Sequence, residues 1–265
     1  MSSQPNHKDK PKPFDLIPRG NYTPTPLISS ILFIGLRAFD GLIFQRALQV
    51  LNPIPVLAAR FNLPIPPPPP TGGPPLSISS HALTPFQTIL WAMALGSALK
   101  HIAWYTLTAK ETMSPSSALA ITLFNLVLNS LNTLSFSLAS VNPTWSPTLL
   151  YASIPLYTIA ILTEFIAEYQ RRVFKDDPKN QGKPFSGGLF GYARSINYFA
   201  YTVWRASFAA ASGGWIWGAL TLGFFWFDFT TRAIPALDGY CNRRYGVQWA
   251  EVKRRVPYAF CPGIW

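Results

Sequence analysis

The chain has 265 residues, of which 49% are hydrophobic and only 12% are charged, and its formal net charge is +11. Ordinary soluble domains carry about 25% charged residues, roughly twice this fraction. The apolar residues lie in blocks as long as the ~20 residues that cross a bilayer. The composition therefore excludes an ordinary soluble domain and predicts an integral membrane protein.

The first apolar block follows a polar, Pro-rich N-terminal segment. Residues 1–26 are predicted to be a disordered cytosolic tail, because they contain few apolar side chains. Residues 27–51 form the block; Arg37 and Asp40 interrupt it one helical turn apart, so the two charges could pair. The segment LPIPPPPPTGGPP, 63–75, predicts an extended polyproline II spacer that ends in a Gly-Gly turn.

Three further apolar blocks, 84–107, 116–140 and 147–167, are each long enough to cross a bilayer. The middle one of these carries three asparagines spaced i, i+4 and i+7, which places them on one helical face: Asn125, Asn129 and Asn132. Two roles are open for these asparagines: hydrogen bonds between helices, or a polar wall of a substrate cavity. The first is slightly favoured.

The last apolar stretch, 198–231, is too long for one span and contains Gly213 and Gly214. It predicts a helical hairpin whose first arm is shorter than a full crossing. The sequence therefore predicts an all-α, polytopic membrane bundle of about six, or seven, helices. Residues 27–167 are expected to form a lipid cavity, and residues 168–265 to form a separate region with a cytosolic loop and a C-terminal tail.

Basic residues are concentrated in the N-terminal tail, the 168–194 loop and the C-terminal tail, whereas the 52–83 and 141–146 connections contain almost none. With six spans, all basic segments share one face. This is the positive-inside pattern, and it predicts that both termini are cytosolic. Because topology accounts for the positive charge, and no zinc-finger or RNA-binding motif is present, no nucleic-acid partner is predicted.

Familiar metal-binding and nucleotide-binding patterns are absent from the sequence. Cys241 and Cys261 lack metal-ligand spacing and are predicted to be reduced thiols in the cytosol. The three His residues are too scattered for a ligand cluster, so no metal is predicted. There is no P-loop and no G-x-G-x-x-G fingerprint, so any nucleotide cofactor must be held by other means.

The loop after the fourth block mixes cations with aromatic residues. Arg171 and Lys175 are four residues apart and point the same way if the helix continues past the block. They predict an anion site at the membrane surface, for lipid headgroups or for the phosphates of a nucleotide. The interleaved aromatic residues and Asn197 favour a planar ring joined to phosphates over a headgroup alone.

The C-terminal segment YCNRRYGVQWAEVKRRVPYAFCPGIW, 240–265, carries a spaced pattern of Cys, Tyr-Gly, Trp, Val-Pro-Tyr and Pro. It resembles the terminal signature of the sterol reductase family, which comprises the C14 and C7 sterol reductases and the reductase-like domain of the lamin B receptor. Upstream, QRRVFK (170–175) and SGGLFGYARSINY (186–198) are similar to two further segments of that family. The short length and the run FKDDPKN (174–180) resemble the wider steroid 5α-reductase-like group.

The resemblance implies an endoplasmic reticulum enzyme in which NADPH reduces a carbon–carbon double bond of a sterol, a steroid or another hydrophobic molecule, such as a terpenoid or polyketide. It implies that Arg171 and Lys175 meet the cofactor phosphates and that Arg194 holds the loop. The other implied cofactor-binding residues are Phe185, Phe190, Asn197, Tyr198, Asp238, Cys241, Asn242, Arg243, Arg244 and Tyr245.

Reduction of a double bond also requires a proton donor. Tyr198, Tyr157 and Glu164 are the candidates. Tyr157 and Glu164 are seven residues apart and share one face of the fourth block. Glu164 fits either a proton relay or a carboxylate in the headgroup zone.

The chain departs from the sterol reductase pattern at Ser195, where that family has His or Lys, at Tyr201 near an expected acidic pair, and at Leu237, where an acidic residue is expected. These departures keep two alternatives open. One is a non-catalytic membrane protein that retains the fold. The other is a methyltransferase of the isoprenylcysteine carboxyl type, which would use S-adenosylmethionine.

Overall fold

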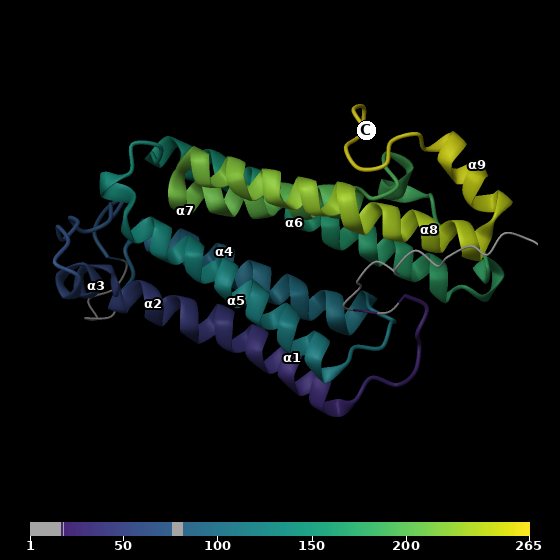
Figure 1. The fold of residues 1–265 in the computed structure, drawn as a ribbon, viewed down its shortest axis with the longest axis horizontal. Helices are drawn as coiled ribbons and strands as arrows, with labels where there is room; N and C mark the ends of the chain where they lie inside the picture. The colour runs from purple at the N-terminus through teal and green to yellow at the C-terminus, as the bar shows by residue number, and fades with distance from the viewer. Residues whose placement is uncertain (1–16, 18, 76–81) are drawn as a thin grey trace, which may run out of the picture.

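The computed structural model describes residues 17, 19–75 and 82–265, and within those ranges the chain forms helices and loops without a strand. The long helices lie side by side in an elongated bundle (Figure 1). α1 continues into α2 through a π-helical turn, Asp40–Phe44. The helices are α1 (Leu27–Phe39), α2 (Gln45–Leu51), α3 (Ile54–Arg60), α4 (Pro85–Ala103), α5 (Pro115–Ser137), α6 (Pro147–Asp176), α7 (Ile196–Asp228), α8 (Ile234–Tyr245) and α9 (Val247–Arg255).

Three of the long helices begin with the same local chemistry. A Ser or Thr precedes a Pro at the first helical position: Thr84 before α4, Ser114 before α5 and Ser146 before α6. Each hydroxyl accepts a hydrogen bond from a backbone N–H of the first turn, and Pro has no N–H to leave unpaired there. Local sequence therefore fixes where these helices start.

Four helical segments are long and apolar enough to cross a membrane: Leu27–Leu51, Pro115–Ser137, Pro147–Asp176 and Ile196–Tyr245. The predicted block 84–107 is not among these four. Its helix, α4, carries Lys100 and His101 and packs against α1 and α6. The chain is therefore a membrane helical protein. The number of complete spans, about six, stays a prediction.

The segment Ile196–Tyr245 reverses direction at Gly213 and Gly214, as the sequence predicts. Gly214 has φ 84° and ψ 174°, a conformation that strongly favours glycine. The two arms pack closely, since a Cβ atom on Gly218 would lie 2.7 Å from the Cβ of Ala210. The loop after α5 covers the turn, because Trp215 N donates to the carbonyl of Thr144 over 3.1 Å.

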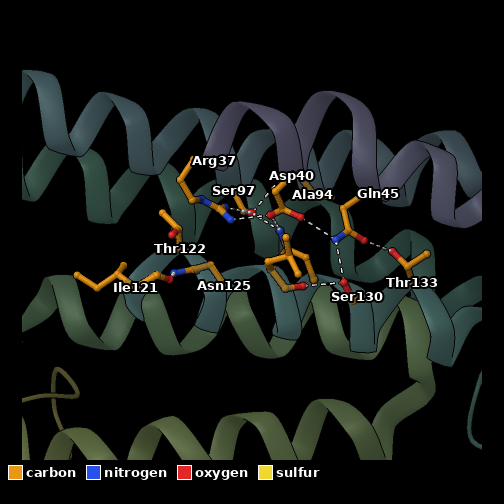
Figure 2. Close-up of polar contacts among 12 residues, drawn as sticks. Arg37, Asp40, Gln45, Ala94, Ser97, Ile121, Thr122, Asn125, Ser130 and Thr133 are labelled. Carbon is orange, nitrogen blue, oxygen red and sulfur yellow. Dashed lines mark hydrogen bonds and ion pairs between the residues drawn. The ribbon is translucent and has the colours of Figure 1, made fainter. Parts of the chain in front are cut away.

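Buried polar side chains connect α1, α2, α4 and α5 inside the bundle (Figure 2). Arg37 and Asp40 pair at 2.6 Å, which confirms the prediction from their spacing. Asp40 also accepts hydrogen bonds from Gln45 over 2.7 Å and from Asn129 over 2.8 Å. Thr133 donates to Gln45 over 2.7 Å. These bonds satisfy charges that would otherwise be costly in a membrane interior.

The predicted asparagine face of α5 makes interhelical hydrogen bonds, the role that the sequence favoured. Asn125 and Asn129 accept hydrogen bonds from Arg205 of α7, and Asn132 accepts one from Trp217 over 2.8 Å. The polar network thus packs the region of residues 27–167 where a lipid cavity was expected. The two cavities described below lie at one end of the bundle, and a lipid cavity formed by residues 27–167 stays a prediction.

Candidate functional site

The described parts of the basic segments meet at one end of the bundle, where α8, α9 and the C-terminal segment also lie (Figure 1). The segment before α1 is joined to the loop before α5 at this end, because the backbone N–H of Thr112 donates to the carbonyl of Asn21 over 2.8 Å. A cleft of about 500 Å³ opens at this end between the last turns of α6, the loop after it and α8. We call it the basic cleft. The cations that line it, among the described residues, are Arg19, Lys110, Arg171, Arg172, Lys175, Arg194 and Arg244.

Eight residues that the sequence analysis assigned to a cofactor site line this cleft together. They come from the end of α6, the loop after it and α8, which are far apart in the sequence. They are Arg171, Lys175, Phe185, Phe190, Arg194, Cys241, Arg244 and Tyr245. The helical continuation of α6 to Asp176 places Arg171 and Lys175 on the cleft, as their spacing predicts.

Lys175 and Tyr245 join α6 to α8 across the cleft. The Lys175 ammonium donates to the Tyr245 hydroxyl over 3.0 Å and lies 4.9 Å from the centre of its ring. Lys175 also donates to the carbonyl of Lys183, which ties the loop to α6. On α8, Arg244 donates to the Tyr240 hydroxyl over 2.6 Å. Aromatic rings and cations therefore alternate along this wall.

Arg171 is held in position by a buried carboxylate. Its guanidinium donates to Glu168 Oε2 over 2.7 Å, and Glu168 Oε1 accepts a hydrogen bond from Asn197 over 2.6 Å. Asn197 is buried and does not line the cleft. Asn197 instead binds the carboxylate of Glu168, which in turn positions Arg171 in the cleft.

The aromatic part of the cleft rests on a tight loop. The ring of Phe185 packs against Phe174 at 4.9 Å and against Phe190 at 5.6 Å. Behind them, Gln170 Oε1 accepts the N–H of Leu189 over 2.9 Å. Gly188 has φ +52°, and a Cβ atom there would lie 2.2 Å from Gln170 Oε1. Gly188 is therefore needed for the loop to fold onto α6.

Arg194 fastens the C-terminal segment to the loop. Its guanidinium donates to the carbonyls of Val256 over 2.6 Å and Pro257 over 2.8 Å, and its backbone N–H donates to the carbonyl of Tyr258 over 2.9 Å. Partial burial lowers the pKa of Arg194, and the Asp238 carboxylate opposes that shift. The resemblance implied that Arg194 holds the loop, and in the structure its side chain joins that loop to the C-terminal segment.

The sequence profile of a family described as "Protein of unknown function (DUF1295)" matches residues 104–256, which include α5 to α9 and most of the basic cleft. The chain belongs to the DUF1295 family. This family is related to the steroid 5-alpha reductases. This agrees with the resemblance to the wider steroid 5α-reductase-like group, whereas membership of the sterol reductase family itself stays a prediction.

A curated relative shows how far the similarity extends. The chain is 35% identical over 244 residues to "Probable O-methyltransferase ustE" of Ustilaginoidea virens. The aligned region covers 87% of this chain and 84% of the relative. The similarity therefore includes the N-terminal helices as well as the DUF1295 region.

Four of the predicted cofactor residues do not line the basic cleft, in addition to Asn197. Tyr198 stacks on Phe229 with ring centres 4.7 Å apart, and its hydroxyl accepts a hydrogen bond from Arg19 over 3.2 Å. Asp238 accepts hydrogen bonds from Trp249 over 2.7 Å and from Asn242 over 2.8 Å. Arg243 and Asn242 are exposed on α8.

The other two candidate proton donors lie inside the bundle. Tyr157 donates to the carbonyl of Met93 over 2.6 Å, so its proton already has an acceptor. Glu164 pairs with Lys100 and accepts a hydrogen bond from Trp204 over 2.6 Å. Glu164 is buried between α4 and α7, and its role as a proton relay stays a prediction. Glu164, Glu168 and Arg171 follow one face of α6 toward the cleft.

A second cavity, of about 550 Å³, adjoins the basic cleft. We call it the apolar cavity. It lies between the segment 230–238 and the C-terminal segment, and it shares Arg194, Leu237 and Trp249 with the cleft. Ser195 also lines it. Two departures from the sterol reductase pattern, Ser195 and Leu237, are therefore wall residues of this cavity.

Sequence reasoning missed the part of the cleft that comes from the N-terminal half. Arg19, Tyr22, Lys110 and Glu111 line the cleft together with Tyr240 of α8. The signal available was topological, because the six-span prediction places the segments before the first block and after the second on the same face. No motif in those segments indicates a ligand.

Proposed function

We propose that this DUF1295 protein is a membrane enzyme that binds NADPH in the basic cleft and reduces a carbon–carbon double bond of a hydrophobic substrate. The observation that carries this proposal is the lining of the cleft. Seven cationic side chains surround it among the described residues, together with aromatic rings. The relation of the family to the steroid 5-alpha reductases supports the same chemistry.

Charge favours NADPH over S-adenosylmethionine as the ligand of this cleft. The phosphates of NADPH are anionic, and Arg and Lys bind phosphates through charge-assisted hydrogen bonds. S-adenosylmethionine has no phosphate and carries a positively charged sulfonium. Concentrating cations of the same sign around it would be unfavourable. In this assignment Arg171 and Lys175 bind phosphates, and Phe185 and Tyr245 contact the rings.

When bound, NADPH supplies a hydride to one carbon of the double bond, and a proton must reach the other carbon. Of the three candidate donors, Tyr198 is the one in contact with a residue of the basic cleft, because its hydroxyl accepts a hydrogen bond from Arg19. Glu164 could supply a proton along the α6 face. Tyr157 is the weakest candidate, because Met93 accepts its hydrogen bond.

O-methyl transfer from S-adenosylmethionine is the second candidate. The observation in its favour is the printed name of the relative, a probable O-methyltransferase that is 35% identical to this chain. One carboxylate, Glu111, is found among the described residues that line the cleft, and it could meet a ribose hydroxyl or the ammonium group of that cofactor. Both candidates place a nucleoside cofactor in the same cleft.

The proposed setting is the endoplasmic reticulum membrane, with the basic end of the bundle facing the cytosol. The proposed substrate partitions into the bilayer and could be a sterol, a steroid, a terpenoid or a polyketide. Membrane lipid would surround the apolar faces of the long helices. A non-catalytic protein that retains this fold remains the alternative to be tested.

The chain's two cysteines offer a test with an internal reference. Cys241 lines the basic cleft, whereas Cys261 lies outside it, and both are buried. The protein in lipid nanodiscs would be alkylated with iodoacetamide, and each site would be quantified by mass spectrometry. We expect NADPH to slow alkylation of Cys241 and to leave Cys261 unchanged. Protection by S-adenosylmethionine instead would favour methyl transfer, and protection by neither would favour the non-catalytic alternative.

A further inference from the structure

The apolar cavity has two preformed walls. Thr230, Ile234 and Pro235 form one wall, at the junction of α7 and α8. The C-terminal segment forms the other wall through Tyr258 and Trp265. Its volume, about 550 Å³, lies within the roughly 300–1,000 Å³ of pockets that hold drug-sized molecules. The cavity is therefore large enough for a multi-ring molecule.

The C-terminal wall is anchored at both ends. Arg194 binds the carbonyls of Val256 and Pro257, as described above. Phe260 is fully buried and packs against Trp226 at 5.0 Å and Phe199 at 5.6 Å. These contacts hold the segment against α7, so the cavity does not depend on a ligand for its shape.

The lining is mainly apolar and aromatic; its charged members are Arg194, which it shares with the basic cleft, and one charged corner. Its aromatic lining residues are Trp249, Tyr258 and Trp265. The corner is the ion pair of Asp238 with Lys253, 3.4 Å apart. A carboxylate can accept several hydrogen bonds, so Asp238 could also accept one from a hydroxyl. Ser195 is small and adds space where a longer side chain would fill the cavity.

Three apolar side chains of the cavity lining are also exposed to a large extent. Ile264 is 74% exposed, Trp265 45% and Tyr258 37%. Tryptophan and tyrosine are enriched where proteins cross the membrane–water interface. The exposed Trp265 and Tyr258 therefore suit a position at that interface.

The apolar cavity and the basic cleft share a wall. Arg194, Leu237 and Trp249 line both spaces, so ligands in the two spaces would meet at these three residues. The cleft is lined by seven cations among the described residues, whereas the cavity is lined mainly by apolar and aromatic side chains together with Arg194, Asp238 and Lys253. Such a pair of sites suits a charged cofactor beside a hydrophobic substrate.

We propose that the apolar cavity is the substrate site, and that it binds a flat, ring-containing hydrophobic molecule with a hydroxyl group directed at Asp238. The identification of the occupant as substrate rests on the proposed function. The placement of the ligand rests only on the cavity. The site lies at the end of the bundle, rather than among residues 27–167 as the sequence suggested.

The test uses 4-hydroxybenzophenone, an aromatic phenol that labels nearby C–H bonds under light. The protein in lipid nanodiscs would be titrated with the probe and irradiated, and labelled peptides would be mapped by mass spectrometry. We expect saturable labelling within 230–238 or 256–265. Ile234→Trp fills the cavity and should abolish that labelling while NADPH still protects Cys241 from alkylation. Thr230→Phe is a second filling variant if Ile234→Trp does not fold.

The matched control removes charge from the cleft instead. Lys175→Gln should weaken protection of Cys241 by NADPH and leave saturable labelling of the two peptides intact. Labelling that never saturates, that survives both filling variants, or that NADPH abolishes by competition would overturn the placement. If labelling is lost in Ile234→Trp but NADPH never protects Cys241, the cavity site stands and the proposed cofactor fails.

Discussion

Charged side chains inside this bundle have partners on other helices or one turn away. The spacing of Arg37 and Asp40 was enough to predict their pairing, because the two are neighbours on one helix. The pairing of Lys100 with Glu164 could not be predicted, because it joins α4 to α6 and depends on how those helices pack. Sequence thus predicts local charge pairs but not pairs between distant helices.

Asp40→Asn should strongly destabilise the protein. Asp40 is fully buried and neutralises Arg37, and removing one partner of a buried pair costs about 3–5 kcal/mol. Asp228→Asn is the control, because Asp228 and Arg232 form a partly exposed pair at (i, i+4), and such pairs contribute about 1 kcal/mol or less. Thermal unfolding in detergent, followed by tryptophan fluorescence, would compare them. Equal shifts in Tm would contradict the role of the network.

Arg194→Lys should loosen the C-terminal segment, because an ammonium cannot reproduce the guanidinium's paired contacts with Val256 and Pro257. Burial raises the pKa of the Cys261 thiol, so in the wild type its alkylation should rise only at a pH above the ordinary thiol range. In the variant, exposure should move that rise to lower pH. Alkylation rates of Cys261 across pH would measure it, and identical profiles would show that Arg194 does not hold the segment.

At the scale of elements, the hairpin of α7 was predictable because two adjacent glycines interrupt an apolar stretch too long for one span. The helical continuation into α8 was not, because hydropathy falls after residue 231 while the chain stays helical to Tyr245. The hydropathy of a segment indicates whether it lies in lipid or in water. It does not indicate whether the backbone is helical, because the helix is formed by backbone hydrogen bonds. The sequence analysis therefore expected a C-terminal tail after the last apolar stretch and did not predict the helix α8 within it.

Gly214→Ala should disrupt the hairpin. A Cβ at this position would lie 2.3 Å from Thr144 Oγ1 and 2.7 Å from the Thr144 carbonyl oxygen, and φ is +84°. We expect a loss of about 1–3 kcal/mol or failure to fold. Gly223→Ala is the matched control, because nothing lies within 4 Å of its added Cβ, and an alanine in a helix is favoured by about 1 kcal/mol. Thermal unfolding of both variants decides the point, and similar behaviour would contradict the tight turn.

At the scale of the whole molecule, charge distribution predicted that the basic segments share one end of the bundle. The structure places their described parts there, and the basic cleft is lined by residues as distant in the sequence as Arg19 and Arg244. The C-terminal motifs identified eight of the cleft residues, because those residues lie within recognisable patterns. The N-terminal contributors and the apolar cavity depend on how the termini fold back onto the bundle, which no local pattern records.

The central claim is that the basic cleft binds an anionic nucleotide. Its most direct test measures NADPH binding to the purified protein through energy transfer from tryptophan to the nicotinamide ring. The comparators are NADH and S-adenosylmethionine. Arg171→Gln with Lys175→Gln removes two cations from the cleft. Arg243→Gln with Arg254→Gln removes two exposed cations that do not line it. Both double variants have the same net charge.

We expect saturable, selective NADPH binding by the wild type. The cleft double variant should bind at least about tenfold more weakly, since each charge-assisted hydrogen bond contributes about 1.5–3 kcal/mol. The control double variant should bind like the wild type. Equal NADPH affinity in the two double variants, or no binding by a folded wild-type protein, would contradict the account.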